Sequence, residues 1–260
     1  MTFRVAVVGA TGRMGGLVSR LIHESNDFEL AAGISSTGEL TEMLGADLVV
    51  DVSVPAASPR IVEFALEHGL KVLVGTSGWT GERLGALAAR ISEVPAAGVI
   101  VVPNFSLGSV LATRFASMAA RYFDSIEIVE AHGASKIDSP SGTAIRTAEL
   151  MASERESGGR GLVAAAHTDQ RARGQQVAGI PVHSIRMQGV VAKQEVHFGG
   201  EGEVLTLRHE TLSPSAYETG ILLALRALPA AQGLTVGLDA LLGLDVEASH
   251  GGEPASPGSR

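Results

Sequence analysis

The first hundred residues alternate short apolar runs with longer segments in which apolar residues recur every three or four positions. Such alternation is typical of β-α-β units, in which helices that pack on a sheet join its parallel strands. Leu17 and Leu21, for example, give their segment one apolar face. We therefore predict a parallel sheet covered by helices. Its predicted strands are Arg4 to Val8, Phe28 to Ile34, Asp47 to Val54, Lys71 to Val74 and Gly98 to Val102.

The pattern changes after about residue 122, where apolar and polar residues begin to alternate one by one. This period is typical of strands that bury one face, so we predict a separate sheet. Its strands are Ile126 to Glu130, Val182 to Met187, Gln194 to Phe198 and Val204 to His209, the last two joined at Gly199-Gly200-Glu201-Gly202. Two more helices are predicted, one from the spacing of Leu111, Phe115, Met118 and Tyr122, and one over Ala216 to Leu228 that is apolar enough to pack on the first domain. Residues 157–180 are predicted to form a long surface loop.

Composition narrows the function classes. The chain has 260 residues, a net charge of −8 and 45% hydrophobic residues, which fits a folded α/β enzyme of two domains. The negative charge disfavours nucleic acid and anionic membranes as partners. Because there are no cysteines, disulfides and thiolate-bound metals are excluded, and we expect no metal site. The opening apolar run is too short for a targeting segment, so we expect a soluble cytoplasmic protein.

A glycine motif follows the first predicted strand. Gly9, Gly12 and Gly15 have the spacing G-x-x-G-x-x-G and lead into a predicted helix. Glycine permits a tight turn and lets the backbone approach a pyrophosphate, whose charge the helix N-terminus favours. The plainer reading is a tight strand-to-helix turn, but the place in the first β-α-β unit favours a dinucleotide site. The predicted nucleotide-binding residues here are Gly9, Ala10, Thr11, Gly12, Arg13 and Met14.

The end of the second strand bears on the choice of cofactor. NAD selectivity normally requires an acid there, bonded to the ribose hydroxyls. Here the strand is followed by Ser35-Ser36-Thr37, and Arg13 is expected nearby. Small hydroxyls and a guanidinium tolerate a 2′-phosphate. We therefore predict that Ser35 contributes to the nucleotide site and that NADPH is favoured or that NADPH and NADH are both used.

Residues 130–144 contain the side chains that most clearly suggest a catalytic site. His132 is of the residue type suited to proton transfer at physiological pH, Lys136 is a mobile cation, and Ser141-Gly142-Thr143 opens a predicted helix whose free N–H groups favour an anion. Taken singly, these are a surface histidine, a solvated lysine and a helix cap. Together they predict a site that protonates a substrate and holds an anion. Combined with a dinucleotide site, they indicate a reductase.

The chain resembles the 4-hydroxy-tetrahydrodipicolinate reductase family, also called dihydrodipicolinate reductases, from about Val5 to Leu244. The motifs that carry the resemblance are Gly9 to Gly15, Val74-Gly75-Thr76-Ser77-Gly78, Pro103-Asn104-Phe105-Ser106, Glu130-Ala131-His132 with Lys136 and Ser139 to Ala144, and Phe198-Gly199 with Glu201-Gly202-Glu203. The resemblance implies hydride transfer from NADPH or NADH to a cyclic unsaturated imine dicarboxylate of the diaminopimelate and lysine pathway.

The resemblance also implies roles for single residues. His132 would be the proton donor, Lys136 would assist protonation and binding, and Ser141, Gly142 and Thr143 would hold a substrate carboxylate. The implied nicotinamide contacts are Gly75, Thr76, Ser77, Val102, Pro103, Asn104 and Phe105. A homotetramer formed through the second sheet is implied as well, and the strands from Val182 to His209 look apolar enough to form it.

These observations predict an α/β protein with an N-terminal Rossmann-type dinucleotide-binding domain and a second α+β domain for substrate binding and tetramerisation. The predicted dinucleotide domain comprises residues 1–105 and 214–248, and the second domain comprises residues 106–213. Residues 249–260, rich in Gly, Pro and Ser, are predicted to be a disordered tail.

One position departs from the family pattern. The family usually has a second histidine after the first, in contact with substrate, and here that residue is Gly133. One alternative is therefore a paralogue that reduces a different cyclic imine, and another is a nucleotide-sensing protein without turnover. Arg171 and Arg173 are possible substitutes for the missing contact. We interpret the other residues that drew attention as structural: His183, His197 and His209 in the second sheet or its interface, and Trp79 as an anchor for the Gly75 to Gly78 loop.

Overall fold

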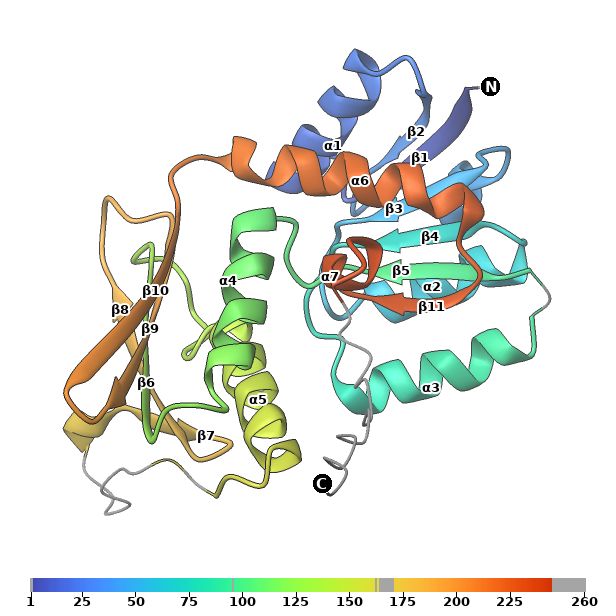
Figure 1. Ribbon diagram of the computed structural model, residues 1–260. Helices are drawn as coiled ribbons and strands as arrows, with labels where there is room; N and C mark the ends of the chain where they lie inside the picture. The colour runs from blue at the N-terminus through green and yellow to red at the C-terminus, as the bar shows by residue number, and fades with distance from the viewer. Residues whose placement is uncertain (1, 95, 162, 164–170, 245–260) are drawn as a thin grey trace, which may run out of the picture.

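The computed structural model describes residues 2–94, 96–161, 163 and 171–244, and it contains two separate sheets (Figure 1). The first has six parallel strands in the order β2-β1-β3-β4-β5-β11. Its strands are β1 (Phe3–Val8), β2 (Phe28–Ile34), β3 (Leu48–Asp51), β4 (Lys71–Val74), β5 (Gly98–Val101) and β11 (Gly233–Val236). The α/β class and the parallel sheet predicted from the sequence are confirmed. The sixth strand was not predicted, because this edge strand is only partly buried and has just two large apolar residues, Leu234 and Val236.

Helices cover both faces of this sheet, which explains why its strands read as continuous apolar runs. α1 (Arg13–Glu24) and α6 (Glu218–Ala227) share one core with Val5 and Val7 of β1. α2 (Ser58–Glu67) and α3 (Gly81–Ser92) share the opposite core with Ala6 and Val8. The prediction that the helix near residues 216–228 packs on the first sheet is thus confirmed.

The third strand is shorter than the predicted Asp47 to Val54, for a local reason. β3 ends at Asp51, whose carboxylate accepts a hydrogen bond from the backbone N–H of Ser53 at 3.0 Å. A side chain that bonds the backbone two residues on favours a turn over continued pairing. The apolar residues Val52 and Val54 therefore follow the strand and do not extend it.

The second sheet has the strand order β10-β9-β6-β8-β7. β6 and β8 pair in parallel, and the other neighbours pair in antiparallel. Its strands are β6 (Ser125–His132), β7 (Gln175–Val177), β8 (Ile180–Arg186), β9 (Ala192–Gly200) and β10 (Glu203–Thr211). α4 (Leu107–Ala119) and α5 (Gly142–Ser157) cover one face (Figure 1), whereas the other, here called the uncovered face, is touched among the described helices only by the short helix η2 (Arg171–Arg173), whose Arg173 pairs with Glu127.

Two predictions for this region need correction. The predicted loop 157–180 contains β7, which pairs with β8. A strand of only three residues has too short a pattern to be predicted. The predicted helix exists as α4, but Phe115 and Met118 of its apolar stripe are each 53% exposed, and Tyr122 lies beyond its end. The helix instead packs on the sheet through small residues such as Ala116.

Short helices complete the connections: η1 (Leu40–Met43), η2 (Arg171–Arg173), η3 (Pro214–Tyr217), η4 (Leu228–Ala230) and α7 (Leu238–Leu241). The predicted tail 249–260 lies outside the described residues. In the described part of the chain, no helix has the length and apolar character needed to cross a membrane.

Candidate active site

The glycine turn after β1 is shaped by backbone contacts. Gly9 has a φ of +88°, and a Cβ built on it would lie 2.6 Å from the carbonyl oxygen of Val52. A Cβ on Gly15 would lie 2.1 Å from the carbonyl oxygen of Gly9. Both glycines are therefore needed for the turn itself, as in the plainer reading of the motif. The turn also fits a pyrophosphate, since Gly12 caps α1 without a side-chain bond and leaves first-turn N–H groups for a ligand.

The remaining predicted residues of this turn are accessible. Thr11, Gly12 and Arg13 are exposed, and Ala10 and Met14 are partly buried. Beyond the end of β2, the Ser35 hydroxyl lies 3.1 Å from that of Thr37. Residues 35–38 include no acid, so this edge of the sheet presents hydroxyl groups where an NAD-selective site would present a carboxylate.

A buried aspartate, which was not singled out from the sequence, ties the Gly75 to Gly78 loop to the sheet. Asp51 is fully buried, and its carboxylate accepts hydrogen bonds from Thr76 Oγ1 at 3.0 Å and from the Ser58 hydroxyl. Trp79 Nε1 donates to Ser58 Oγ at 3.0 Å, so its predicted role as a loop anchor is confirmed. Because the Thr76 hydroxyl donates to Asp51, the Thr76 side chain holds the loop in place.

The predicted nicotinamide-contacting residues lie at the carboxyl ends of β4 and β5, the usual edge for ligands in such sheets. Val102 and Phe105 are buried in the core, so only their backbone can face a ligand. Gly75 lies against the Phe105 ring, since a Cβ there would be 2.5 Å from Phe105 Cε2. The side chains of Ser77 and Pro103 are exposed.

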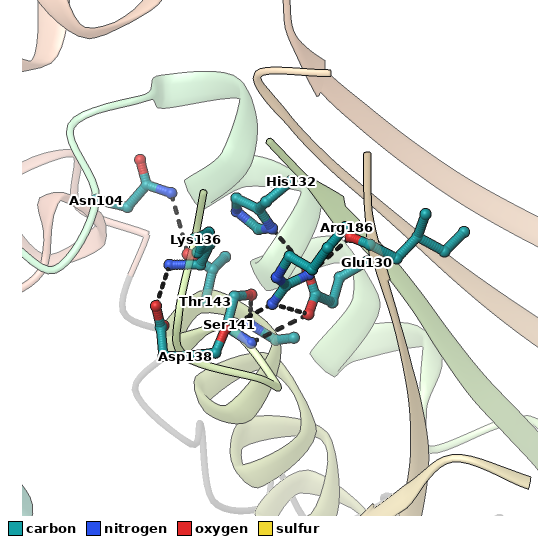
Figure 2. A network of polar contacts seen from close by, with 10 residues as sticks. Asn104, Glu130, His132, Lys136, Asp138, Ser141, Thr143 and Arg186 are labelled. Atoms are coloured by element: carbon teal, nitrogen blue, oxygen red, sulfur yellow. Dashed lines mark hydrogen bonds and ion pairs between the residues drawn. The ribbon is translucent and has the colours of Figure 1, made fainter. Parts of the chain in front are cut away.

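Asn104 joins the two predicted parts of the site. Its Nδ2 donates to Ser109 Oγ at 2.9 Å and to Thr143 Oγ1 at 3.4 Å, and its Oδ1 accepts from the Ser106 N–H at 2.9 Å. Figure 2 shows Asn104 bonded to Thr143 at the start of α5. The carboxyl edge of the first sheet therefore contacts the start of α5, the helix that packs on the second sheet.

His132 belongs to a buried polar cluster. It ends β6, and its Nδ1 lies 2.6 Å from Oε2 of Glu130, two residues earlier on the same face of the strand. Arg186, opposite His132 in the β6–β8 register, places Nη1 2.9 Å from Oε2 and Nη2 2.8 Å from Oε1 of the same carboxylate. The Glu130 side chain is fully buried, and that of His132 is 17% exposed, so the ring remains within reach of a substrate.

The carboxylate of Glu130 is held ionised. Burial opposes ionisation, but hydrogen bonds from His132, Arg186 and Ser184 outweigh it and lower the pKa from 4.5 to about 2. The backbone N–H of Ser141 also donates to Oε1, at 3.2 Å. Neither Glu130 nor Arg186 was predicted as a site residue, although the alternation in β6 places Glu130 on the same face as His132.

Lys136 and the start of α5 lie beside this cluster (Figure 2). Lys136 Nζ is 2.8 Å from Asp138 Oδ1. Burial opposes ionisation of Asp138, and the Lys136 ammonium outweighs it and lowers the pKa of that carboxyl. Ser141 caps α5 by accepting from the Ala144 N–H at 3.3 Å, and the space above Gly142 is open. A helix start with free N–H groups and a nearby ammonium suits a carboxylate.

A Cβ on Gly133 would lie 3.3 Å from the carbonyl oxygen of Val190, a tight contact that a shift of a few tenths of an ångström would relieve. The proposed substitution of the missing histidine by Arg173 is wrong: this guanidinium pairs with Glu127 on the uncovered face of the second sheet. The side chain of Arg171 is outside the described part of the structure. The guanidinium at the site belongs to Arg186.

The three other histidines of the second sheet have structural partners, as interpreted from the sequence. His183 pairs with Glu127, and His197 Nδ1 lies 3.1 Å from Thr206 Oγ1. Both are on the uncovered face. That face is largely polar, although it includes the exposed Ile185 and Val204, because most apolar residues of these strands point toward α4 and α5. His209 Nε2 lies 3.2 Å from Ser106 Oγ, and burial lowers its pKa.

Comparisons with known proteins agree with this architecture. A family model described as "Dihydrodipicolinate reductase, N-terminus" matches residues 3–105, and one described as "Dihydrodipicolinate reductase, C-terminus" matches residues 108–242. The chain is 65% identical, over 100% of its length and 93% of the relative's, to a 4-hydroxy-tetrahydrodipicolinate reductase from Clavibacter sepedonicus. It is 45% identical to the protein of that name from Streptomyces griseus subsp. griseus, over 93% of this chain and 98% of the relative. The solved structure of dipicolinate-bound dihydrodipicolinate reductase from Paenisporosarcina sp. TG-14 is similar, with a TM-score of 0.75 and 30% identity over 92% of this chain and 99% of that one.

Proposed function

The chain belongs to the dihydrodipicolinate reductase family, and we propose that it uses NADPH or NADH to reduce the cyclic imine dicarboxylate derived from 4-hydroxy-tetrahydrodipicolinate. The product is tetrahydrodipicolinate, in the diaminopimelate and lysine pathway. The observation that carries the proposal is the Asn104–Thr143 contact, which brings the His132 and Lys136 cluster to the ligand edge of the first sheet. No observation favours the paralogue or the nucleotide-sensing alternative.

The nucleotide would be held along the carboxyl edge of the first sheet. Gly9 to Met14 and Ser35 would hold the adenosine and pyrophosphate parts, where the turn leaves room for phosphate oxygens beside backbone N–H groups. Gly75 to Ser77 and Val102 to Phe105 would border the nicotinamide, largely through backbone atoms. When bound, the nicotinamide supplies the hydride.

His132 would supply the proton that accompanies hydride addition. An acid whose pKa lies near the operating pH suits this task, and histidine is the common choice. The ring is partly exposed at the end of β6 and is anchored by Glu130. Lys136 would assist protonation and attract the dicarboxylate.

The substrate carboxylate would be bound by the backbone at the start of α5, at Ser141, Gly142 and Thr143. The open space above Gly142 and the helix N-terminus support this assignment. Lys136, now paired with the 60% exposed Asp138, can exchange that solvent-screened partner for a substrate carboxylate.

Cofactor preference, domain limits and assembly complete the proposal. The hydroxyl-rich end of β2 and the exposed Arg13 support use of NADPH at least as efficient as use of NADH. We assign residues 1–105 and 214–248 to the dinucleotide domain and residues 106–213 to the substrate domain. The uncovered face of the second sheet would form the contacts of a homotetramer in the cytoplasm.

The test is an assay of the purified protein with the freshly prepared lysine-pathway intermediate and each cofactor in turn. We expect oxidation of NADPH that depends on the intermediate, with tetrahydrodipicolinate as product. Normal NADPH binding without turnover of this intermediate would contradict the proposal and favour another imine as substrate.

A further inference from the structure

Glu130 lies at the centre of the polar cluster shown in Figure 2, and its carboxylate accepts hydrogen bonds from four residues. Arg186 reaches both oxygens, the Ser141 N–H reaches Oε1, His132 Nδ1 reaches Oε2, and the Ser184 hydroxyl donates as well. Burial of a carboxylate costs free energy unless hydrogen-bond donors surround it. The donors of this cluster therefore stabilise a negative charge beside the His132 imidazole.

The contact with Glu130 decides where the histidine carries its hydrogen. An ionised carboxylate only accepts, so Nδ1 of His132 must be protonated in the neutral ring as well as in the cation. Nε2 is then the nitrogen that gains and loses the proton during turnover. If the neutral ring carried its hydrogen on Nε2, the lone pair of Nδ1 would face the carboxylate and repel it.

We propose that Glu130 is a positioning residue for the reaction: it fixes His132 as the Nδ1–H tautomer with Nε2 toward the substrate, and through the Ser141 N–H it holds the start of α5 in register with that ring. The inference rests on the proposed function of His132 as the proton donor. One carboxylate thereby aligns the proton donor with the turn that binds the substrate carboxylate.

Arg186 fixes the carboxylate in turn. Its Nη2 also donates to the carbonyl of Asp138 at 2.7 Å, and its Nη1 to the carbonyl of Ile185 at 2.8 Å. The guanidinium is therefore tied to the loop that carries Lys136 as well as to β8. A planar fork that meets a carboxylate in two places restricts rotation of that carboxylate, which a single bond would not.

The all-donor surroundings make a sharp test possible with Glu130→Gln, which keeps the shape of the side chain. An amide has one acceptor and one donor end, and either orientation turns an N–H₂ group toward donors. At the Oε2 position it would face Arg186 Nη1 and drive His132 to the Nε2–H tautomer. At the Oε1 position it would face Arg186 Nη2 and the Ser141 N–H.

We expect Glu130→Gln to lower kcat by about 10- to 10,000-fold, the range seen when the partner that orients a histidine is removed, with NADPH affinity within about twofold. Glu63→Gln is the control, because Glu63 lies on α2, away from the cluster and from the uncovered face of the second sheet, and its carboxylate also pairs with an arginine, Arg90. Its kcat should stay within about twofold of the wild-type value. A Glu130→Gln enzyme with wild-type kcat would overturn the proposal.

The tautomer of His132 can be read directly from imidazole ¹⁵N shifts in the wild-type protein, assigned with His132→Gln. We expect protonated Nδ1 in the neutral ring of the wild type, and a smaller Nδ1–H fraction in Glu130→Gln, because one of the two amide orientations turns its N–H₂ group toward Nδ1. An Nε2–H tautomer in wild type would overturn the proposal even if the variant does not fold. This measurement needs no turnover, so absent activity with the lysine-pathway intermediate would count against the proposed function and not against the tautomer.

Discussion

The glycine turn after β1 and the polar cluster at the end of β6 are held in shape by different forces. In the turn, backbone atoms pack so closely that Gly9 and Gly15 leave no space for a Cβ. In the cluster, Glu130, His132 and Arg186 are oriented by hydrogen bonds between side chains of two strands. A substitution in the turn should therefore change folding and nucleotide affinity together, whereas one in the cluster can change turnover with the fold intact.

The largest effect that separates the regions is expected at Gly15. Gly15→Ala would place a Cβ 2.1 Å from the Gly9 carbonyl oxygen, so we expect a loss of about 3 kcal/mol or more in unfolding free energy and loss of NADPH binding. Gly16 is the matched control, since a Cβ there meets nothing within 4 Å. Gly16→Ala should stabilise α1 by about 0.5 to 1 kcal/mol. Urea unfolding and NADPH titration of both variants measure this, and equal behaviour would refute the packing argument.

The cluster should make its own contribution to stability, and that contribution should depend on pH. Because folding lowers the pKa of Glu130 from 4.5 to about 2, its stabilisation is complete above about pH 4.5 and is lost as the pH falls toward 2. The shift corresponds to roughly 3 kcal/mol. Urea unfolding at about pH 5 and about pH 3 should show the gap between wild type and Glu130→Gln narrowing at the lower pH. A constant gap would mean that the carboxylate is not preferentially ionised in the folded state.

A substitution at His132 tests whether turnover can be lost while the fold stays intact. His132→Gln removes the proton donor, so we expect kcat to fall by roughly 10²-fold, with melting temperature and NADPH affinity near the wild-type values. Steady-state kinetics and calorimetric titration measure the two parts separately. A parallel loss of cofactor affinity would show that the cluster also shapes the nucleotide site.

Lys136 should affect substrate more than cofactor. Lys136→Ala removes a cation from a site that binds a dicarboxylate, so KM should rise by about tenfold and kcat should fall as well. Lys71→Ala is not a suitable comparison, because Lys71 bonds the carbonyls of Pro229 and Ala231 within the fold. Lys193→Ala, which breaks an ion pair with Glu195 on the uncovered face, is the better control. If only cofactor affinity changed in Lys136→Ala, the assigned role would be wrong.

The smallest effect concerns the choice between cofactors. Ser35→Asp would place a carboxylate where a 2′-phosphate is expected, so the ratio of kcat/KM for NADPH to that for NADH should fall by several-fold to about tenfold. A strong preference for NADH in the wild-type enzyme would contradict the proposed specificity before any substitution is made.

The two regions also differed in how far the sequence predicted them. The glycine turn and the stretch from His132 to Thr143 were recognisable because their residues are close together in the chain. Arg186 was not, since its place beside Glu130, 56 residues away in sequence, depends on the pairing of β6 with β8. Asp51 was missed for a similar reason, because its partner Thr76 is 25 residues away on the loop after another strand.

Patterns of apolar residues predicted the presence of most elements but not which face they bury. The stripe of α4 that includes Phe115 and Met118 points to solvent, because the sheet offers room only for small residues such as Ala116. The apolar strands of the second sheet likewise bury the face toward α4 and α5. Only tertiary packing decides such cases.

The claim that the two regions serve one reaction can be tested most directly with NADPH deuterated at the transferable position. Incubated with the lysine-pathway intermediate, the wild-type enzyme should produce tetrahydrodipicolinate that carries one deuterium per molecule, detected by mass spectrometry. His132→Gln, with its nucleotide site intact, should give the same labelled product at a much lower rate. NADPH binding without any labelled product from the wild-type enzyme would contradict the account.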